Sequence, residues 1–344
     1  MPDNARCLPS AAKFMMPFRM VYSDSYVLPI GTHIFPADKY KRTHDRLLET
    51  GQATADEFIA PQPARDEDVL LVHTPLYVEK LRKGLLSTRE ELELEIPYSP
   101  ELAQAFWLMA GGSILAADFA LQDGVAIHLG GGFHHAFPDH GEGFCLIHDV
   151  AIAVRRMQQD GRIARALIVD CDVHQGNGTA VIFGHGEPEP FPKPSWSAGM
   201  FAERREAHMK VGSPRDVFTI SLHQENNYPG WKPASSVDVN LPDGTTDEEY
   251  LIWLGRSLEK AREGFESELL CFVAGADPYR DDQLGGLGLT IEGLRRRDEL
   301  VFRFARELNI PVMVTLAGGY AQNLDDTITI HTNTVLAARE IFGR

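Results

Sequence analysis

The sequence predicts an α/β fold in which a mainly parallel central sheet carries helices on both faces. Short, nearly continuous apolar runs alternate with longer stretches of helical character, as expected when strands of a parallel sheet are buried on both faces. Polar residues gather just after several of the apolar runs. In such folds, sites lie at the carboxyl ends of the strands.

Six apolar runs are expected to be strands because they are short, rich in β-branched residues and bounded by polar or turn-forming residues. They are residues 69–73, 125–129, 166–170, 217–222, 269–274 and 311–316.

Three longer stretches have the periodicity of helices, and each begins at residues that favour a helix N-terminus. They are 101–121 after Ser99-Pro100, 250–263 after Thr246 with Glu249 as a capping box, and 291–308 after Thr290.

Composition narrows the class of protein. The chain has 344 residues, 44% of them hydrophobic, and its net charge is 33 − 49 = −16. That charge argues against direct nucleic-acid binding, which needs a basic surface, and is compatible with a basic substrate. The four cysteines are scattered and form no CxxC pair, so we expect reduced thiols and a cytoplasmic protein.

No apolar run reaches the length that we expect of a membrane helix, and no secretory signal is evident. We expect residues 1–15 to be an unstructured extension and residues 16–344 to form one catalytic domain. Within it, 184–215 is a long loop insertion without strong periodicity. Segments of this kind are active-site rims or mobile surface loops. The sequence does not indicate an oligomeric state.

The strongest chemical signal is ALIVDCDVHQGNG, residues 166–178. An apolar strand leads into Asp170, Asp172 and His174, whose i, i+2, i+4 spacing would place them on one face of an extended strand. Buried ionisable groups are costly unless they are paired or bind a metal, and an Asp and a His can both reach one Zn²⁺. The alternative is an edge strand with incidental polar residues.

Asp277 follows the apolar run 269–274 in the same way. Added to Asp172 and His174, it would give three protein ligands and an open fourth position, the arrangement of a catalytic zinc site. On its own, an aspartate here is more often a helix cap or a turn residue.

Two further strand ends carry groups suited to hydrolysis. His134 and His135 follow three glycines after the run 125–129, and two imidazoles near a metal could serve as base and acid. Tyr320 follows Gly318-Gly319 after the run 311–316. Its phenol could donate a hydrogen bond to a developing oxyanion.

These motifs, in this order, resemble those of the zinc-dependent histone deacetylase family over most of the chain. The similar segments are LGGGFHHAFPDHGEGFCLIHD (129–149), LIVDCDVHQGNGT (167–179), GADPYRDDQLGGLGLT (275–290) and AGGYAQN (317–323), with VYSDSYVLP (21–29) and LLVHTPLYVEKL (70–81) toward the start. The HQGNG form is similar to the class IV branch and its bacterial relatives.

The resemblance implies a single-domain, three-layer arginase/deacetylase-type fold and one Zn²⁺ per chain, held by Asp172, His174 and Asp277. It implies that His134 and His135 are a tandem acid–base pair, with Asp170 and Asn177 as their partners, and that Tyr320 polarises the acyl carbonyl. The implied substrate tunnel consists of Gly132, Phe133, Phe144, Tyr228, Leu284, Gly318 and Gly319. A potassium ion is implied at Asp170, Ser221 and Leu222.

Several positions depart from the family pattern. Many members have Asp where Asn177 stands, and Asn cannot supply the charge that orients the second histidine. Gln175 replaces a frequent His. The rim carboxylate that grips the substrate backbone in some members has no clear counterpart, and the region 91–95 is the candidate.

The expected function is hydrolytic removal of an acetyl or longer acyl group from a lysine side chain or a related amine, with an acylpolyamine or small-molecule amidohydrolase as the alternative. A two-metal arginase-like enzyme would need further carboxylates, but Gly176 and Tyr279 stand at those positions. A dinucleotide-binding dehydrogenase would need a third glycine after Gly176-Asn177-Gly178. A non-catalytic acyl-lysine reader would not require Tyr320 and both histidines together.

Overall fold

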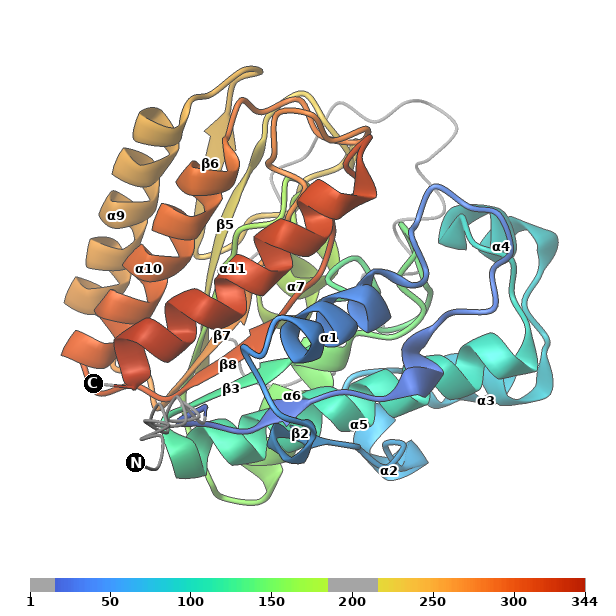
Figure 1. The fold of residues 1–344 in the computed structure, drawn as a ribbon. Helices are drawn as coiled ribbons and strands as arrows, with labels where there is room; N and C mark the ends of the chain where they lie inside the picture. Colours follow the sequence, from blue (N-terminus) through green and yellow to red (C-terminus); the bar gives the residue numbers. More distant parts are fainter. Residues whose placement is uncertain (1–15, 185–215, 344) are drawn as a thin grey trace, which may run out of the picture.

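Eight strands, all parallel, form one central sheet in the computed structural model, which describes residues 16–184 and 216–343. Their order is β2-β1-β3-β8-β7-β4-β5-β6 (Figure 1). The strands are β1 Met20–Val21, β2 Phe58–Ile59, β3 Val125–His128, β4 Ala166–Asp170, β5 Val217–Gln224, β6 Val237–Leu241, β7 Leu269–Val273 and β8 Val312–Thr315.

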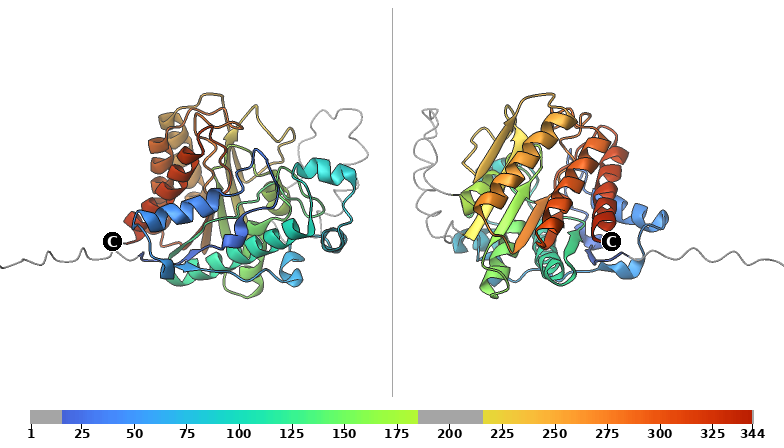
Figure 2. Two further views of the ribbon diagram at one scale, coloured as in Figure 1. Left: turned by 45° about the vertical axis from the view of Figure 1, so that its right-hand side comes forward. Right: turned by 90° about the vertical axis from the view of Figure 1, so that its left-hand side faces the viewer.

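Helices cover both faces of the sheet, so the predicted α/β architecture is confirmed. One layer contains α9, α10 and α11 side by side, with α1 against α11, and the opposite layer contains α5 and α6 (Figures 1 and 2). The helices are α1 Lys39–Glu49, α2 Asp66–Val69, α3 Pro75–Lys83, α4 Thr88–Leu94, α5 Pro100–Asp123, α6 Asp149–Gln159, α7 Asn177–Phe183, α9 Asp247–Gly264, α10 Ile291–Glu307 and α11 Leu324–Phe342.

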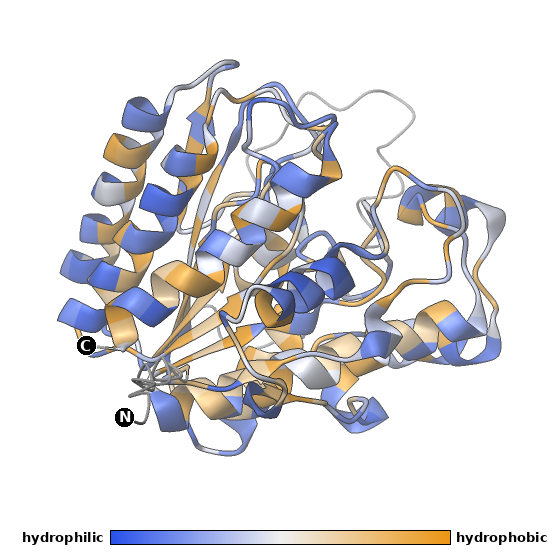
Figure 3. Cartoon of the chain, viewed as in Figure 1, coloured by the Kyte–Doolittle hydropathy of each residue, from blue (hydrophilic) through white to orange (hydrophobic). Residues whose placement is uncertain are grey.

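Apolar residues concentrate on the strands and on the helix faces that meet them, whereas the outward faces of α9 and α10 are mostly polar (Figure 3). The central strands β3, β4, β7 and β8 are buried along their whole length. Their continuous apolar character follows from this double-sided burial.

The three predicted helix starts are confirmed. Ser99 accepts a hydrogen bond from the Leu102 N–H, and Thr290 accepts one from the Gly293 N–H. Thr246 and Glu249 form a capping box. Side-chain acceptors at these positions satisfy N–H groups that have no partner within the helix.

One predicted strand is wrong. Residues 69–73 belong to the end of α2 and to the turn that follows it. Three successive acidic residues, Asp66 to Asp68, occupy the first turn of α2, and the Asp68 carboxylate accepts a hydrogen bond from the Arg65 N–H. This local capping favours helix, and the apolar run after it forms a turn in which Leu70 is 42% exposed while Val72 and His73 are buried.

Three strands were not predicted. β1 and β2 contain two residues each, too few to show a period. β6 lies at the sheet edge and alternates polar with apolar residues, so it lacks the continuous apolar run of the central strands. The predicted extension 1–15 and, apart from Gly184, the predicted insertion 184–215 lie outside the described residues.

Helix α5 is long and apolar enough to cross a membrane by length and composition, contrary to the expectation that no segment would be. However, 72% of its apolar stretch is buried inside the fold, where it packs on β3, β8 and α6. Its apolar character is that of a core helix.

The segment after β2 lies directly against α5. The Ala64 N–H donates to the Trp107 carbonyl oxygen at 2.9 Å. A Cβ atom at Gly111 would stand 1.9 Å from the Gln62 carbonyl oxygen. Glycine is therefore required at this point of the helix by the close approach of another backbone.

We expect Gly111→Ala to lower the free energy of unfolding by about 1–3 kcal/mol, because the overpacking exceeds the gain of about 1 kcal/mol in helix propensity. Gly255→Ala in α9 is the matched control, since a Cβ there meets nothing within 4 Å. It should raise stability by about 0.5–1 kcal/mol. Urea unfolding of both variants measures the difference, and equal stabilisation by both would contradict the packing argument.

Candidate active site

A cavity of about 250 Å³ opens at the carboxyl edge of the sheet, among the loops that follow β3, β4, β7 and β8. Eleven of the predicted site residues line it: Gly132, Phe133, His134, His135, Phe144, Asp172, His174, Tyr228, Leu284, Gly318 and Tyr320. Residues from distant parts of the sequence thus meet here because parallel strands present their carboxyl ends at one edge.

Asp172, His174 and Asp277 form a buried cluster whose ligand atoms all lie within 4.8 Å of one another. The His174 Nδ1 lies 3.1 Å from the Asp172 Oδ1 and 3.5 Å from the Asp277 Oδ2. The Asp277 Oδ2 is buried and has no hydrogen-bond partner. A buried carboxylate oxygen without a partner is costly, and it is available as a metal ligand.

The protonation of this cluster also fits a bound cation. Burial and the neighbouring Asp172 raise the pKa of Asp277 to about 7. Burial lowers the pKa of His174, but Asp172 and Asp277 outweigh it and raise that pKa to about 10. In this arrangement a proton or a metal ion offsets the two carboxylates. The three donors match the Asp/His chemistry of a zinc site with an open position.

The loop backbone closes tightly around the cluster. The Gly318 N–H donates to the Asp172 Oδ2 at 3.1 Å, and the Val173 N–H donates to the Asp277 Oδ1 at 2.9 Å. A Cβ at Gly318 would stand 2.1 Å from the Asp277 Oδ2. Gly318 therefore lets the chain after β8 approach both carboxylates.

The i, i+2, i+4 argument for residues 170–174 is wrong, although it selected the right residues. β4 ends at Asp170. The Asp172 N–H then donates to the Asp170 Oδ1, and the His174 N–H donates to the Asp172 Oδ1. These short-range hydrogen bonds hold a turn, so Asp172 and His174 reach the cavity from a loop.

His134 is paired directly with a carboxylate. Its Nδ1 lies 2.7 Å from the Asp170 Oδ2, and both side chains are buried. Burial lowers the pKa of His134, but Asp170 and Asp172 outweigh it and raise the pKa to about 9. The glycine loop before it is held by Asp149, whose carboxylate accepts hydrogen bonds from the Gly132 and Phe133 N–H groups.

His135 has a different partner. Its Nδ1 lies 2.7 Å from the Asn177 Oδ1, and its Nε2 lies 3.1 Å from the His134 Nε2. Burial, followed by the neighbouring His134 and His174, holds the pKa of His135 well below its usual value. The two adjacent imidazoles therefore differ in charge and in basicity.

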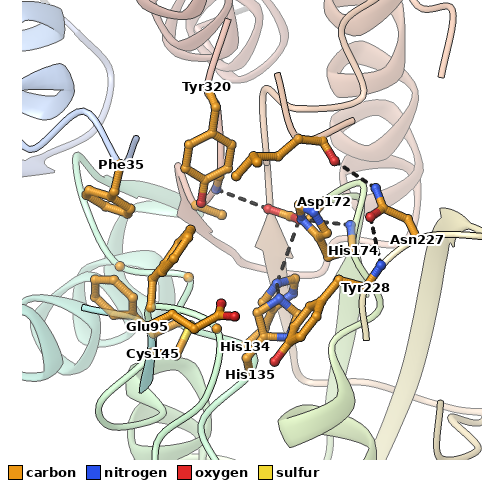
Figure 4. Close-up of a pocket in the computed structure, with 18 of the residues that line it drawn as sticks. Phe35, Glu95, His134, His135, Cys145, Asp172, His174, Asn227, Tyr228 and Tyr320 are labelled. Atoms are coloured by element: carbon orange, nitrogen blue, oxygen red, sulfur yellow. Dashed lines mark hydrogen bonds and ion pairs between the residues drawn. The ribbon is translucent and has the colours of Figure 1, made fainter. Parts of the chain in front are cut away.

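Tyr320 points its hydroxyl into the cavity that the histidine pair faces, and the Glu95 carboxylate points into it from another side (Figure 4). Burial, then Asp172 and Asp277, raise the pKa of Tyr320 well above its usual value, so the phenol keeps its proton. The Asp282 carboxylate fixes the Tyr320 backbone by accepting its N–H at 2.7 Å.

Aromatic rings wall the cavity. Phe144 and Phe35 each have a ring centroid 6.1 Å from that of Tyr320, and the Tyr228 ring meets His135 edge-on at 5.0 Å. Phe144 has a φ of +67°, an uncommon conformation for a bulky residue that is often found at functional sites.

The remaining predicted residues lie outside the cavity lining. Gly319 faces the packed interior, where a Cβ would meet Thr327 at 2.8 Å. Ser221 and Leu222 lie in β5, and Ser221 pairs with Asp170 in the strand register. The Ser221 hydroxyl lies 2.9 Å from the His223 Nδ1.

Sequence reasoning missed Phe35, Lys39 and Glu142. Phe35 lies in an irregular segment without periodicity. Lys39 is fully buried in α1, and its ammonium group donates to the Ala317 carbonyl oxygen at 2.6 Å and lies 5.2 Å from the Tyr320 ring centroid. Nothing in the helical pattern marks this lysine as buried. Glu142 contacts Asn177, and the missing charge at position 177 was the available signal.

We expect Asp172→Ala to bind zinc much more weakly than the wild type, because one of the three candidate ligands is removed and two protein ligands make a poor site. Zinc content per chain after dialysis, measured by mass spectrometry, tests this directly. Asp281→Ala, which removes an exposed carboxylate near the same loop, should keep wild-type zinc. Wild-type zinc affinity in Asp172→Ala would exclude Asp172 as a ligand.

Comparison with known proteins finds one family that matches most of the chain. The family model described as the histone deacetylase domain matches residues 33–335. An uncharacterised protein of Picosynechococcus sp. is 37% identical over 328 residues, covering 95% of this chain and all of that protein. Histone deacetylase 2 of Arabidopsis thaliana is 30% identical over 317 residues, covering 88% of this chain and 75% of that protein.

Solved structures agree on the fold. The crystal structure of the HDA15 HD domain has a TM-score of 0.71 at 22% identity and covers 94% of this chain and 88% of that one. A histone deacetylase homologue complexed with SAHA has a TM-score of 0.71 at 24% identity, with 95% and 84% coverage. These similarities establish the three-layer arrangement of the sheet and its helices.

Proposed function

Because this chain belongs to the histone deacetylase domain family, we propose that it is a zinc-dependent amidohydrolase that removes an acyl group from a lysine side chain or a related amine. The observation that carries the proposal is the meeting of three features at one cavity. These are the buried Asp–His–Asp cluster, the histidine pair and the Tyr320 phenol.

A zinc ion held by Asp172, His174 and Asp277, one per chain, would polarise the amide carbonyl and lower the pKa of a water molecule. The neutral His135 would take a proton from a water molecule that adds to the carbonyl carbon. The Tyr320 hydroxyl donates a hydrogen bond to the oxyanion that develops. When the C–N bond breaks, the histidine pair delivers a proton to the leaving nitrogen, and the products are a carboxylate and a free amine.

The tunnel walls fit the rest of the substrate. Phe144 and Tyr228 would enclose the apolar stem of an acylated lysine, with Leu284 at the rim. Within the candidate region 91–95, Glu95 is the residue that lines the cavity, and we propose it as the rim carboxylate. Its negative charge also favours a second candidate substrate, an acylated polyamine, whose remaining amines are cationic.

Two further features belong to the proposal. A potassium ion would be held by Asp170, Ser221 and the Leu222 carbonyl oxygen, beside the carboxylate that orients His134. The proposed compartment is the cytoplasm, which suits the free and buried thiols of Cys145, Cys171 and Cys271.

A panel of acyl-lysine peptides and acylated polyamines with short and long acyl chains tests the substrate class. We expect turnover of at least one series, with loss of turnover after chelation and recovery on adding Zn²⁺, because three protein ligands leave the site dependent on its metal. Full turnover in protein shown to be metal-free would overturn the zinc assignment. Preference for polyamines over peptides would select the second candidate.

We expect Tyr320→Phe to lower turnover by about 10²–10³, the usual cost of removing one oxyanion donor. Substrate affinity should change much less, because the hydrogen bond strengthens as charge develops. Zinc content and melting temperature should stay close to wild type, since the ring and its contacts remain. Turnover, substrate affinity, zinc content and melting temperature, measured together, distinguish a hydrolase from a reader of acylated lysine, because a reader has no transition state to stabilise. Turnover within a few-fold of wild type would remove Tyr320 from the mechanism.

A further inference from the structure

Glu142 lies behind the histidine pair, one hydrogen bond beyond Asn177. The Asn177 Nδ2 donates to the Glu142 Oε1 at 2.8 Å, and the Asn177 Oδ1 lies 2.7 Å from the His135 Nδ1. The three side chains therefore form a continuous chain from the cavity to a carboxylate. We propose that Glu142 is the positioning residue of His135: it orients the Asn177 amide and supplies, through that amide, the negative charge that asparagine lacks.

The orientation of the amide follows from the chemistry of its partners. An ionised carboxylate only accepts hydrogen bonds, so the NH₂ group of Asn177 must face Glu142 and its oxygen must face His135. The His135 Nδ1 therefore carries a proton, and its Nε2 keeps a lone pair. That Nε2 faces His134 and the cavity. Glu142 thus selects the tautomer in which His135 can act as a base.

Glu142 is held in its charged form by its neighbours. Burial raises the pKa of its carboxyl group, but hydrogen bonds from His140 and Tyr228 outweigh burial, and the pKa falls below its usual value. A charge-assisted hydrogen bond on the Asn177 NH₂ group polarises the amide and makes its oxygen a stronger acceptor. The Glu142 charge, acting through the Asn177 amide, then orients and stabilises the His135 ring in part, as the Asp170 carboxylate does for His134 by direct contact.

The same oxygen also anchors a wall of the tunnel. The Tyr228 hydroxyl donates to the Glu142 Oε1 at 2.5 Å, and the Tyr228 ring packs edge-on against His135. Loss of Glu142 would therefore disturb both the base and the wall. Tyr228→Phe separates the two, because it removes the hydroxyl and leaves the link from Glu142 through Asn177 to His135 intact.

The test is a charge exchange between positions 142 and 177. Glu142→Gln should lower kcat about tenfold with KM within about threefold, since a charged acceptor becomes neutral. Asn177→Asp should lower kcat at least as much, because two carboxylates would then face each other at hydrogen-bond distance. The double variant Asn177→Asp/Glu142→Gln restores one negative charge, and its kcat should return to within about threefold of wild type.

Controls keep a folding defect apart from the proposed role. Zinc content should match wild type in all variants, and melting temperature should match it in all but Asn177→Asp, where two carboxylates in close contact are buried together. Tyr228→Phe should change KM more than kcat, and Glu263→Gln, an exposed change on α9, should change neither. A Glu142→Gln enzyme with wild-type kcat would overturn the proposal. The proposal would also be overturned if the fold-reduction in kcat of the double variant equalled the product of the fold-reductions of the two single variants.

The proposal rests on the proposed function, so one readout must not depend on turnover. Nitrogen NMR of the zinc-loaded protein, with the His135 signals assigned by substitution, reports which ring nitrogen carries the proton. We expect Nδ1–H in the wild type and a mixture of tautomers in Glu142→Gln. Protonation at Nε2 in the wild type would exclude the role of Glu142. Wild-type protein with Nδ1–H but no deacylase turnover would instead count against the function alone.

Discussion

The cost of burying charge governs the candidate site. Asp170, Asp172 and Asp277 are all at most 2% exposed, and a buried carboxylate is tolerated only with a partner. Asp170 has His134 and Asp172 has His174, whereas one oxygen of Asp277 has no partner. A cation bound at Asp172, His174 and Asp277 would give the unpartnered Asp277 oxygen a partner. The loop after β8 can approach these carboxylates closely because residue 318 is a glycine.

The parallel sheet creates this concentration of charge. Every strand ends at the same edge, so the residues after β3, β4, β7 and β8 meet whatever their separation in sequence. The sheet also explains why the sequence is informative. Four strands buried on both faces leave continuous apolar runs, and each polar residue that interrupts such a run at its end marks the edge where the site lies.

Strands that are buried on both faces were predicted correctly from their apolar runs. The prediction of a strand at 69–73 was wrong because local hydrogen bonds at the start of α2 favour a helix there. The runs 166–170 and 269–274 match β4 and β7 closely, and their trailing residues Asp172, His174 and Asp277 form the candidate metal cluster. The run 69–73 has similar apolar content, but the acidic first turn of α2 holds it outside the sheet. Composition alone does not distinguish a partly buried turn from a buried strand.

The side chains around the metal cluster were harder to predict because their role depends on a partner far away in sequence. Phe35 enters the wall from an irregular segment, and Lys39 reaches the Ala317 carbonyl oxygen across 278 positions. Neither belongs to a periodic pattern that a single sequence can reveal. Asn177 was recognised as a departure, but only the structure shows that Glu142 stands behind it.

The two adjacent histidines differ in their hydrogen-bond partners and therefore in their charge. His134 contacts a carboxylate directly, and its raised pKa keeps a proton on the ring. His135 is separated from a carboxylate by an amide, and burial beside two other imidazoles keeps it neutral. If both partners were carboxylates in direct contact, the pair would hold more positive charge, and the neutral base would be harder to maintain. In the proposed mechanism, an asparagine backed by a glutamate would keep the orientation that a carboxylate imposes while leaving the ring uncharged, and the two adjacent histidines would have separate tasks in one reaction.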